Sequence, residues 1–229
     1  MAIAFVNQSS GVTDQEVADY AEACNSQLQN EVAKAWQIAD PLAVTVKPSD
    51  GDYIFYFVDE IHEAPGALAY HDVDAKGVPY GKIGVKTTQQ AGESVSGAAS
   101  HEAVELQCDI YCASWSFSNG LKSLVATEAC DPVQAETYKV HVSSGADVEV
   151  SNFVTPLYFT PVQSGTFDYL KSLSSPFEIS HGGYQIRMKG GAVHNVFGDK
   201  VSDEYKQAKR ASHGRTYWRQ IEVALAQEQ

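Results

Sequence analysis

Apolar positions near the start of the chain recur at the spacing of one helix face. Residues 17–39 carry this pattern, Thr13 and Asp14 can cap its beginning, and Pro41 stops it. We therefore predict a first long helix here, after a short apolar segment at residues 2–6.

A different texture follows, with β-branched and aromatic residues in short runs. Residues 41–46, 53–61 and 67–71 are of this kind and predict strands. Residues 78–86 predict a further strand, and Pro79 within it removes a backbone donor. We therefore expect residues 78–86 to lie at the edge of a sheet.

The rest of the chain predicts helices first and strands later. Helical periodicity from residue 101 to about 115 follows a polar loop, with Ser94 or Ser100 as its cap, and a second helix is expected within residues 121–129. From residue 137 the pattern changes to strands and loops, and residues 202–227 predict a C-terminal helix.

These elements indicate an α+β fold. We expect an α/β part over residues 1–132, with a mixed sheet, and a strand-and-loop-rich part over residues 133–229 that ends in the helix. One continuous domain is the alternative.

Composition narrows the classes of function. The chain is 44% hydrophobic and 20% charged, as in ordinary globular proteins, and its net charge is −13. That charge argues against nucleic-acid binding, which needs clustered Lys and Arg. No apolar stretch is long enough to cross a bilayer and no secretory signal is evident, so we expect synthesis in the cytoplasm and no membrane partner.

The charge is concentrated in the first third. Residues 1–75 hold 13 acids and two bases, whereas basic residues gather between Lys200 and Arg219. These regions are either solvated surfaces or complementary faces for other protein subunits.

The segment S-H-E-A-V-E-L-Q-C-D, residues 100–109, carries the most informative chemistry. On a helix, His101 and Glu105 share a face, and Glu102 projects about 100° away. A divalent cation held by the first pair can polarise water, and a carboxylate at the position of Glu102 can accept its proton.

An edge strand, a loop and an H-E-x-x helix in this order resemble the zincin metallopeptidases. The resemblance implies a zincin-like fold, a peptide substrate paired with residues 78–86, and a third metal ligand from a second helix downstream. Glu128 is our choice for that ligand, with Asp131 and Asp109 as competitors. Glu105 departs from the usual final His, and this harder ligand favours manganese, iron or calcium relative to zinc.

Further motifs resemble a group of uncharacterised phage and bacterial proteins. They are S-H-E-x-x-E, E-x-C-D-P, S-N-F-V-T-P and G-G-Y. This resemblance implies no particular activity, but it suggests that the protein comes from a phage or bacterial system and is located in the virion.

Two functions follow. In the first, a zinc-dependent metallopeptidase, His101, Glu105 and Glu128 hold Zn²⁺, with another divalent cation or none as alternatives, and Glu102 is the catalytic base. In the second, the chain is a non-catalytic structural component of a phage particle or another assembly, built on a degenerate zincin-like fold, and its partners are other protein subunits.

The remaining candidate residues carry less weight. Cys130 could meet Cys108 or Cys112 at disulfide distance, with buried thiols as the alternative. His62, His71 and His181 lack a partner at ligand spacing, so we expect surface or core roles for them.

Overall fold

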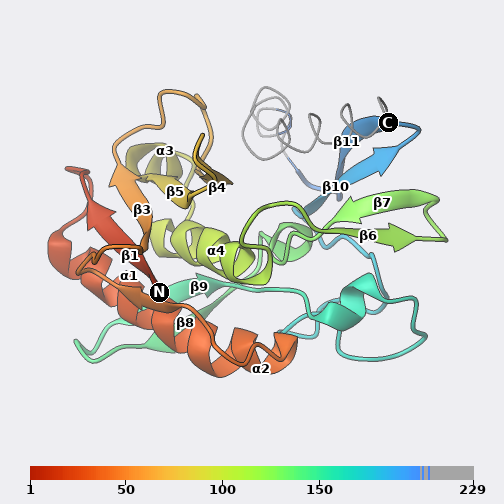
Figure 1. Ribbon diagram of the computed structural model, residues 1–229, viewed down its shortest axis with the longest axis horizontal. Helices are drawn as coiled ribbons and strands as arrows, with labels where there is room; N and C mark the ends of the chain where they lie inside the picture. Colours follow the sequence, from red (N-terminus) through yellow and green to blue (C-terminus); the bar gives the residue numbers. More distant parts are fainter. Residues whose placement is uncertain (202, 204–205, 207–229) are drawn as a thin grey trace.

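The computed structural model describes residues 1–201, 203 and 206. Within them the chain has an α+β fold, built from two larger sheets, a hairpin and two long helices (Figure 1). The predicted C-terminal helix over residues 202–227 lies, except for residues 203 and 206, outside the described part. In the described part, no helix is both long and apolar enough to span a membrane.

The first helix forms where the apolar periodicity predicts it. Thr13 caps it, because its hydroxyl accepts a hydrogen bond from the backbone N–H of Glu16 at 3.2 Å and the Glu16 carboxylate accepts one from the N–H of Thr13 at 2.7 Å. The helix runs through three consecutive pieces: α1 (Asp14–Gln27), the π-helical turn η1 (Leu28–Val32) and α2 (Ala33–Trp36). It ends at Gln37, which adopts the left-handed conformation.

The first sheet has the order β2-β1-β3-β5-β4. Its strands are β1 (Ala2–Asn7), β2 (Ala43–Thr45), β3 (Tyr53–Val58), β4 (Ala69–Val73) and β5 (Pro79–Gly84). Neighbouring strands are parallel, except that β4 runs antiparallel to β5.

The prediction of an edge position for residues 78–86 is wrong. β5 lies between β3 and β4, so β4 ends the strand order of the described sheet. Pro79 is tolerated because it is the first residue of β5, where it pairs only with Val73 of β4, and the pairing with β3 begins at Tyr80.

The short helix α3 (Val85–Gln90) leads to α4 (Val95–Cys108), the helix of the H-E-x-x-E motif. Ser94 caps α4 by accepting a hydrogen bond from the N–H of Gly97 at 3.1 Å. The helix ends at Cys108, short of the predicted residue 115, because the carboxylate of Asp109 accepts hydrogen bonds from the N–H groups of Ala113 and Ser114.

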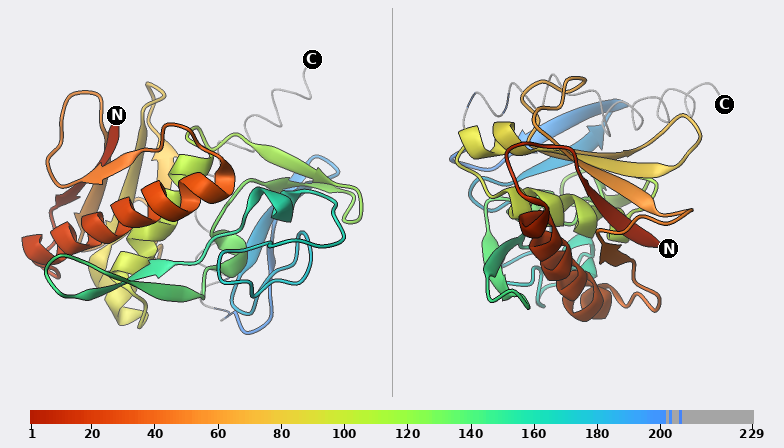
Figure 2. Two further views of the ribbon diagram at one scale, coloured as in Figure 1. Left: turned by 90° about the horizontal axis from the view of Figure 1, so that it is seen from below. Right: turned by 90° about the vertical axis from the view of Figure 1, so that its left-hand side faces the viewer.

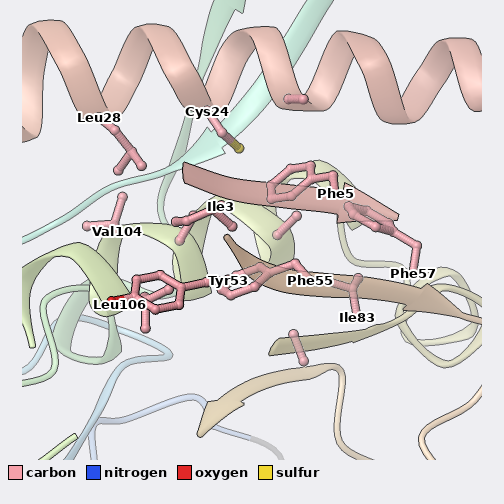
Figure 3. Packing of buried hydrophobic residues seen from close by; sticks show 14 of the residues in the cluster. Ile3, Phe5, Cys24, Leu28, Tyr53, Phe55, Phe57, Ile83, Val104 and Leu106 are labelled. Carbon is pink, nitrogen blue, oxygen red and sulfur yellow. The ribbon is translucent and has the colours of Figure 1, made fainter. Parts of the chain in front are cut away.

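The main core fills the space between the first sheet and the helices α1 and α4 (Figure 3). Phe5 and Phe55 stack at a centroid distance of 5.9 Å, and Leu28 of the first helix and Val104 of α4 belong to the same cluster, where they point toward each other. All four side chains are buried, so this core fixes α4 against the sheet.

Elements from the second half of the chain complete the structure. The hairpin strands β8 (Thr137–His141) and β9 (Asp147–Ser151) pack against α1 and α4, which lie between the hairpin and the first sheet (Figure 2). Phe153, just after β9, belongs to the main core.

A second, antiparallel sheet has the order β11-β10-β7-β6. Its strands are β6 (Trp115–Ser118), β7 (Ser123–Ala126), β10 (Tyr184–Lys189) and β11 (Ala192–Phe197).

One sequence prediction fails here. The expected helix within residues 121–129 is the strand β7, since a short apolar run suits either conformation and here pairs with β6 and β10. The segment after Thr155, within the region expected to hold strands and loops, forms the 3₁₀ turn η3 (Pro156–Phe159).

Candidate metal centre

The helix α4 presents the three titratable residues of the motif. His101 and Glu105 share a face as predicted, and Nε2 of His101 lies 3.5 Å from Oε2 of Glu105. Glu102 and Glu105 are buried, with 6% and 3% of their surface exposed. A helix that is buried on most of its surface thus brings two carboxylates and an imidazole into the interior.

Asp131, which follows β7 in the chain, lies close to the same histidine, His101. Its Oδ1 atom lies 3.2 Å from Nε2 of His101, and Asp131 is buried at the start of the 3₁₀ turn η2 (Asp131–Val133). Oε1 of Glu105 accepts hydrogen bonds from the N–H groups of Cys130 and Asp131, at 3.1 Å and 3.3 Å. Glu105 therefore also holds in place the segment that delivers Asp131.

His71, for which the sequence predicts only a surface or core role, contacts two members of this group. It sits on β4 at 1% exposure, and its Nδ1 atom is 2.6 Å from Oε2 of Glu102 and 3.9 Å from Oε2 of Glu105. The expectation of an ordinary core or surface role for His71 overlooked these contacts. No local spacing could reveal them, because Glu102 lies 31 residues away along the chain.

The side chains form two groups of three with metal-ligand chemistry. In each group the ligand atoms lie within 4.8 Å of one another. One group is His101, Glu105 and Asp131, and the other is His71, Glu105 and Glu128. All five residues offer ligand atoms that divalent cations accept in proteins.

The predicted third ligands are placed differently from one another. Asp131 joins His101 and Glu105, whereas Glu128 joins the group of His71. Glu128 does not lie on a second helix, as the zincin resemblance implied, but in the connection between β7 and η2. Asp109 is used in the turn after α4, where it binds Ala113 and Ser114.

Burial and charge act in opposite directions on this cluster. Burial disfavours a charged His101, but the carboxylates of Glu105 and Asp131 outweigh it and raise the pKa of His101 well above its usual value. Burial likewise opposes an ionised Glu102, yet the hydrogen bond with His71 and the charge of His101 lower the pKa of Glu102. The cluster therefore favours a protonated His101 and an ionised Glu102.

The nearby cysteine Cys130 is a buried thiol. Burial, followed by the negative charge of Glu105, raises its pKa well above the usual value. Cys130 is therefore protonated near neutral pH and is a poor metal ligand there.

The cluster borders a cavity of about 710 Å³. Its walls come from α4, from β4 with the residues preceding it, from the 128–135 segment, and from β10 and β11. Its polar lining includes all six members of the cluster: His71, His101, Glu102, Glu105, Glu128 and Asp131. This volume suits a small molecule or a few residues of an extended chain.

Comparison of the chain with protein-family models, with curated proteins and with solved structures gave no match.

Proposed function

We propose that the protein is a metal-dependent hydrolase, zincin-like in its arrangement, that acts on peptide bonds. The observation that carries the proposal is the convergence of His101, Glu105 and Asp131 on one point at the wall of the cavity. The site would take one divalent cation there through one imidazole and two carboxylates. Such a ligand set suits manganese or iron as well as zinc.

Glu102 is the residue that we propose as general base. It follows His101 directly on α4, it lines the cavity, and its lowered pKa keeps it ionised. A bound cation would supply an acidified water, and the Glu102 carboxylate would accept the proton from it. The hydrogen bond with His71 fixes the position of this carboxylate.

A peptide substrate would pair with β4, and not with residues 78–86 as the sequence predicted. It ends the described sheet, and residues 69–71 line the cavity beside the cluster. An extended peptide can add to such an edge through backbone hydrogen bonds, which favours peptide over small-molecule substrates.

Metal analysis combined with a peptide-cleavage assay tests this function. Protein purified without chelator should contain a divalent metal and cleave an unstructured protein such as casein, and EDTA should abolish the cleavage. Glu102→Gln should retain the metal and lose about 10²- to 10⁴-fold in turnover. Glu93→Gln is the matched control, because Glu93 also lines the cavity but is exposed and lies outside the cluster.

The outcome also decides between the two functions predicted from the sequence. Bound metal without turnover in the unmodified protein would contradict the hydrolase and favour the non-catalytic structural role. Absence of both metal and turnover would contradict the metal centre as well.

A further inference from the structure

The group of His71, Glu105 and Glu128 stands beside the one assigned to the catalytic cation. Its members are buried at 1%, 3% and 2% exposure, and their ligand atoms also lie within 4.8 Å of one another. The group thus has the ligand number and the spacing of a cation site of its own.

The two groups meet at one carboxylate. Oε2 of Glu105 lies 3.5 Å from the ring of His101 and 3.9 Å from the ring of His71. Oε1 of the same residue is held by the backbone of Cys130 and Asp131, so the carboxylate has a fixed orientation. A carboxylate placed between two ligand groups is the usual bridge in two-metal sites, where the ions lie about 3.5–4 Å apart.

The remaining contacts of His71 fit a metal ligand. Metal-binding histidines usually bind a carboxylate through the ring nitrogen that does not face the metal. Nδ1 of His71 lies 2.6 Å from Oε2 of Glu102 and 3.9 Å from Oε2 of Glu105, and Nε2, the second ring nitrogen, is buried as well. With Nδ1 bound to Glu102, Nε2 is the nitrogen that would bind the cation, and Glu102 would fix the orientation of the ring.

The charge of the cluster points the same way. Four carboxylates, those of Glu102, Glu105, Glu128 and Asp131, are buried together. Ionised carboxylates in the interior are costly unless cations accompany them. With both imidazoles neutral, as metal ligands are, two divalent ions would balance the charge of four ionised carboxylates.

We propose that the protein binds two divalent cations that share Glu105, one with His101 and Asp131 and the other with His71 and Glu128. The inference rests on the proposed function, because the first of these ions is the catalytic one. The second ion would help to acidify the attacking water and to stabilise the negative charge that develops on the substrate carbonyl.

Titration of the EDTA-treated 229-residue chain with Mn²⁺ tests this proposal, with the bound metal counted and its electron paramagnetic resonance spectrum recorded. We expect two ions per chain and the spectrum of a spin-coupled pair. Glu128→Gln and Asp131→Asn should each leave one ion with an uncoupled spectrum, and Glu93→Gln should still bind two. Circular dichroism shows whether each variant is folded.

The possible results separate the two proposals. One ion in the unmodified protein, lost in Asp131→Asn and kept in Glu128→Gln, would overturn the paired site and leave the proposed function intact. No ion in the unmodified protein would overturn both. If Glu128→Gln does not fold, the stoichiometry and spin coupling of the unmodified protein decide by themselves.

Discussion

The two oxygens of Glu105 have different roles, which a histidine at this position could not both fill. Oε1 accepts two backbone hydrogen bonds from the segment of Asp131, and Oε2 faces the imidazoles of His71 and His101. An imidazole has a single acceptor nitrogen, so it could not replace both functions.

Two replacements of Glu105 should therefore separate its structural role, through Oε1, from its proposed role as a metal ligand, through Oε2. Glu105→Gln keeps an oxygen that can accept from Cys130 and Asp131, whereas Glu105→His leaves buried N–H groups without their acceptor. We expect Glu105→His to lower the free energy of unfolding by about 1–3 kcal/mol more than Glu105→Gln, the cost of an unsatisfied buried donor. Urea denaturation in EDTA measures the difference, and equal stabilities would contradict this view of Oε1.

The raised pKa of His101 predicts a pH dependence of stability in the absence of metal. The folded pKa exceeds the unfolded value of about 6.5, so the stabilisation is fully present below that pH. It is lost as the pH rises through the higher folded pKa. Urea midpoints in EDTA should fall across this range, and the fall should be smaller in His101→Asn; parallel profiles for the two proteins would refute the assignment.

Residues were predictable from the sequence only where their partners are local. The spacing of His101 and Glu105 on one helix, and the cap at Thr13, depend on neighbours within four positions, and both are confirmed. His71 depends on β4 lying beside α4, and the choice between Glu128 and Asp131 depends on how the chain turns after β7. Neither arrangement leaves a local pattern.

At the scale of elements, the same limit explains the misplaced edge of the sheet. Pro79 does exclude one hydrogen-bonded neighbour, but only at its own position, and the rest of β5 pairs on both sides. Gly81, in the middle of β5, lies under the buried ring of Phe55, where a Cβ would come within 2.7 Å of a ring carbon. The glycine marks close packing inside the sheet.

A second glycine, Gly183, allows the chain just before β10 to approach the η2 turn closely. A Cβ on Gly183 would lie 2.1 Å from the carbonyl oxygen of Pro132 and 3.2 Å from that of Asp131. Gly183→Ala should thus displace the η2 turn, lower stability by about 1–3 kcal/mol and weaken Mn²⁺ binding. Gly81→Ala should cost similar stability, because the added Cβ would meet the ring of Phe55, and it should also affect Mn²⁺ binding, because Gly81 pairs with His71 across β4 and β5.

Thermal denaturation and Mn²⁺ titration of the two variants check this prediction. Gly120→Ala serves as the control, since nothing lies within 4 Å of the added Cβ. Unchanged metal affinity in Gly183→Ala would show that η2 does not depend on this contact.

At the scale of the whole molecule, the candidate centre joins elements that are far apart in the sequence. The candidate ligands come from β4, from α4 and from the segment that runs from Glu128 to Asp131, and β10 and β11 line the cavity as well. A cation bound to all three ligand segments would therefore act as a cross-link between the first sheet, the central helix and the start of the second half.

Metal binding should accordingly stabilise the molecule unevenly. Mn²⁺ at about 100 times its dissociation constant adds about 2.7 kcal/mol to the free energy of unfolding for each site. Amides that exchange through local opening should be slowed in α4, β4 and residues 128–133, because the ions join these segments. The turn of the β8–β9 hairpin, where the N–H of Val142 binds the carbonyl of Ala146, lies on the far side of α1 and α4 and should exchange at an unchanged rate. Hydrogen exchange followed by mass spectrometry, with and without Mn²⁺, makes the comparison, and slowing confined to other segments would place the ions elsewhere.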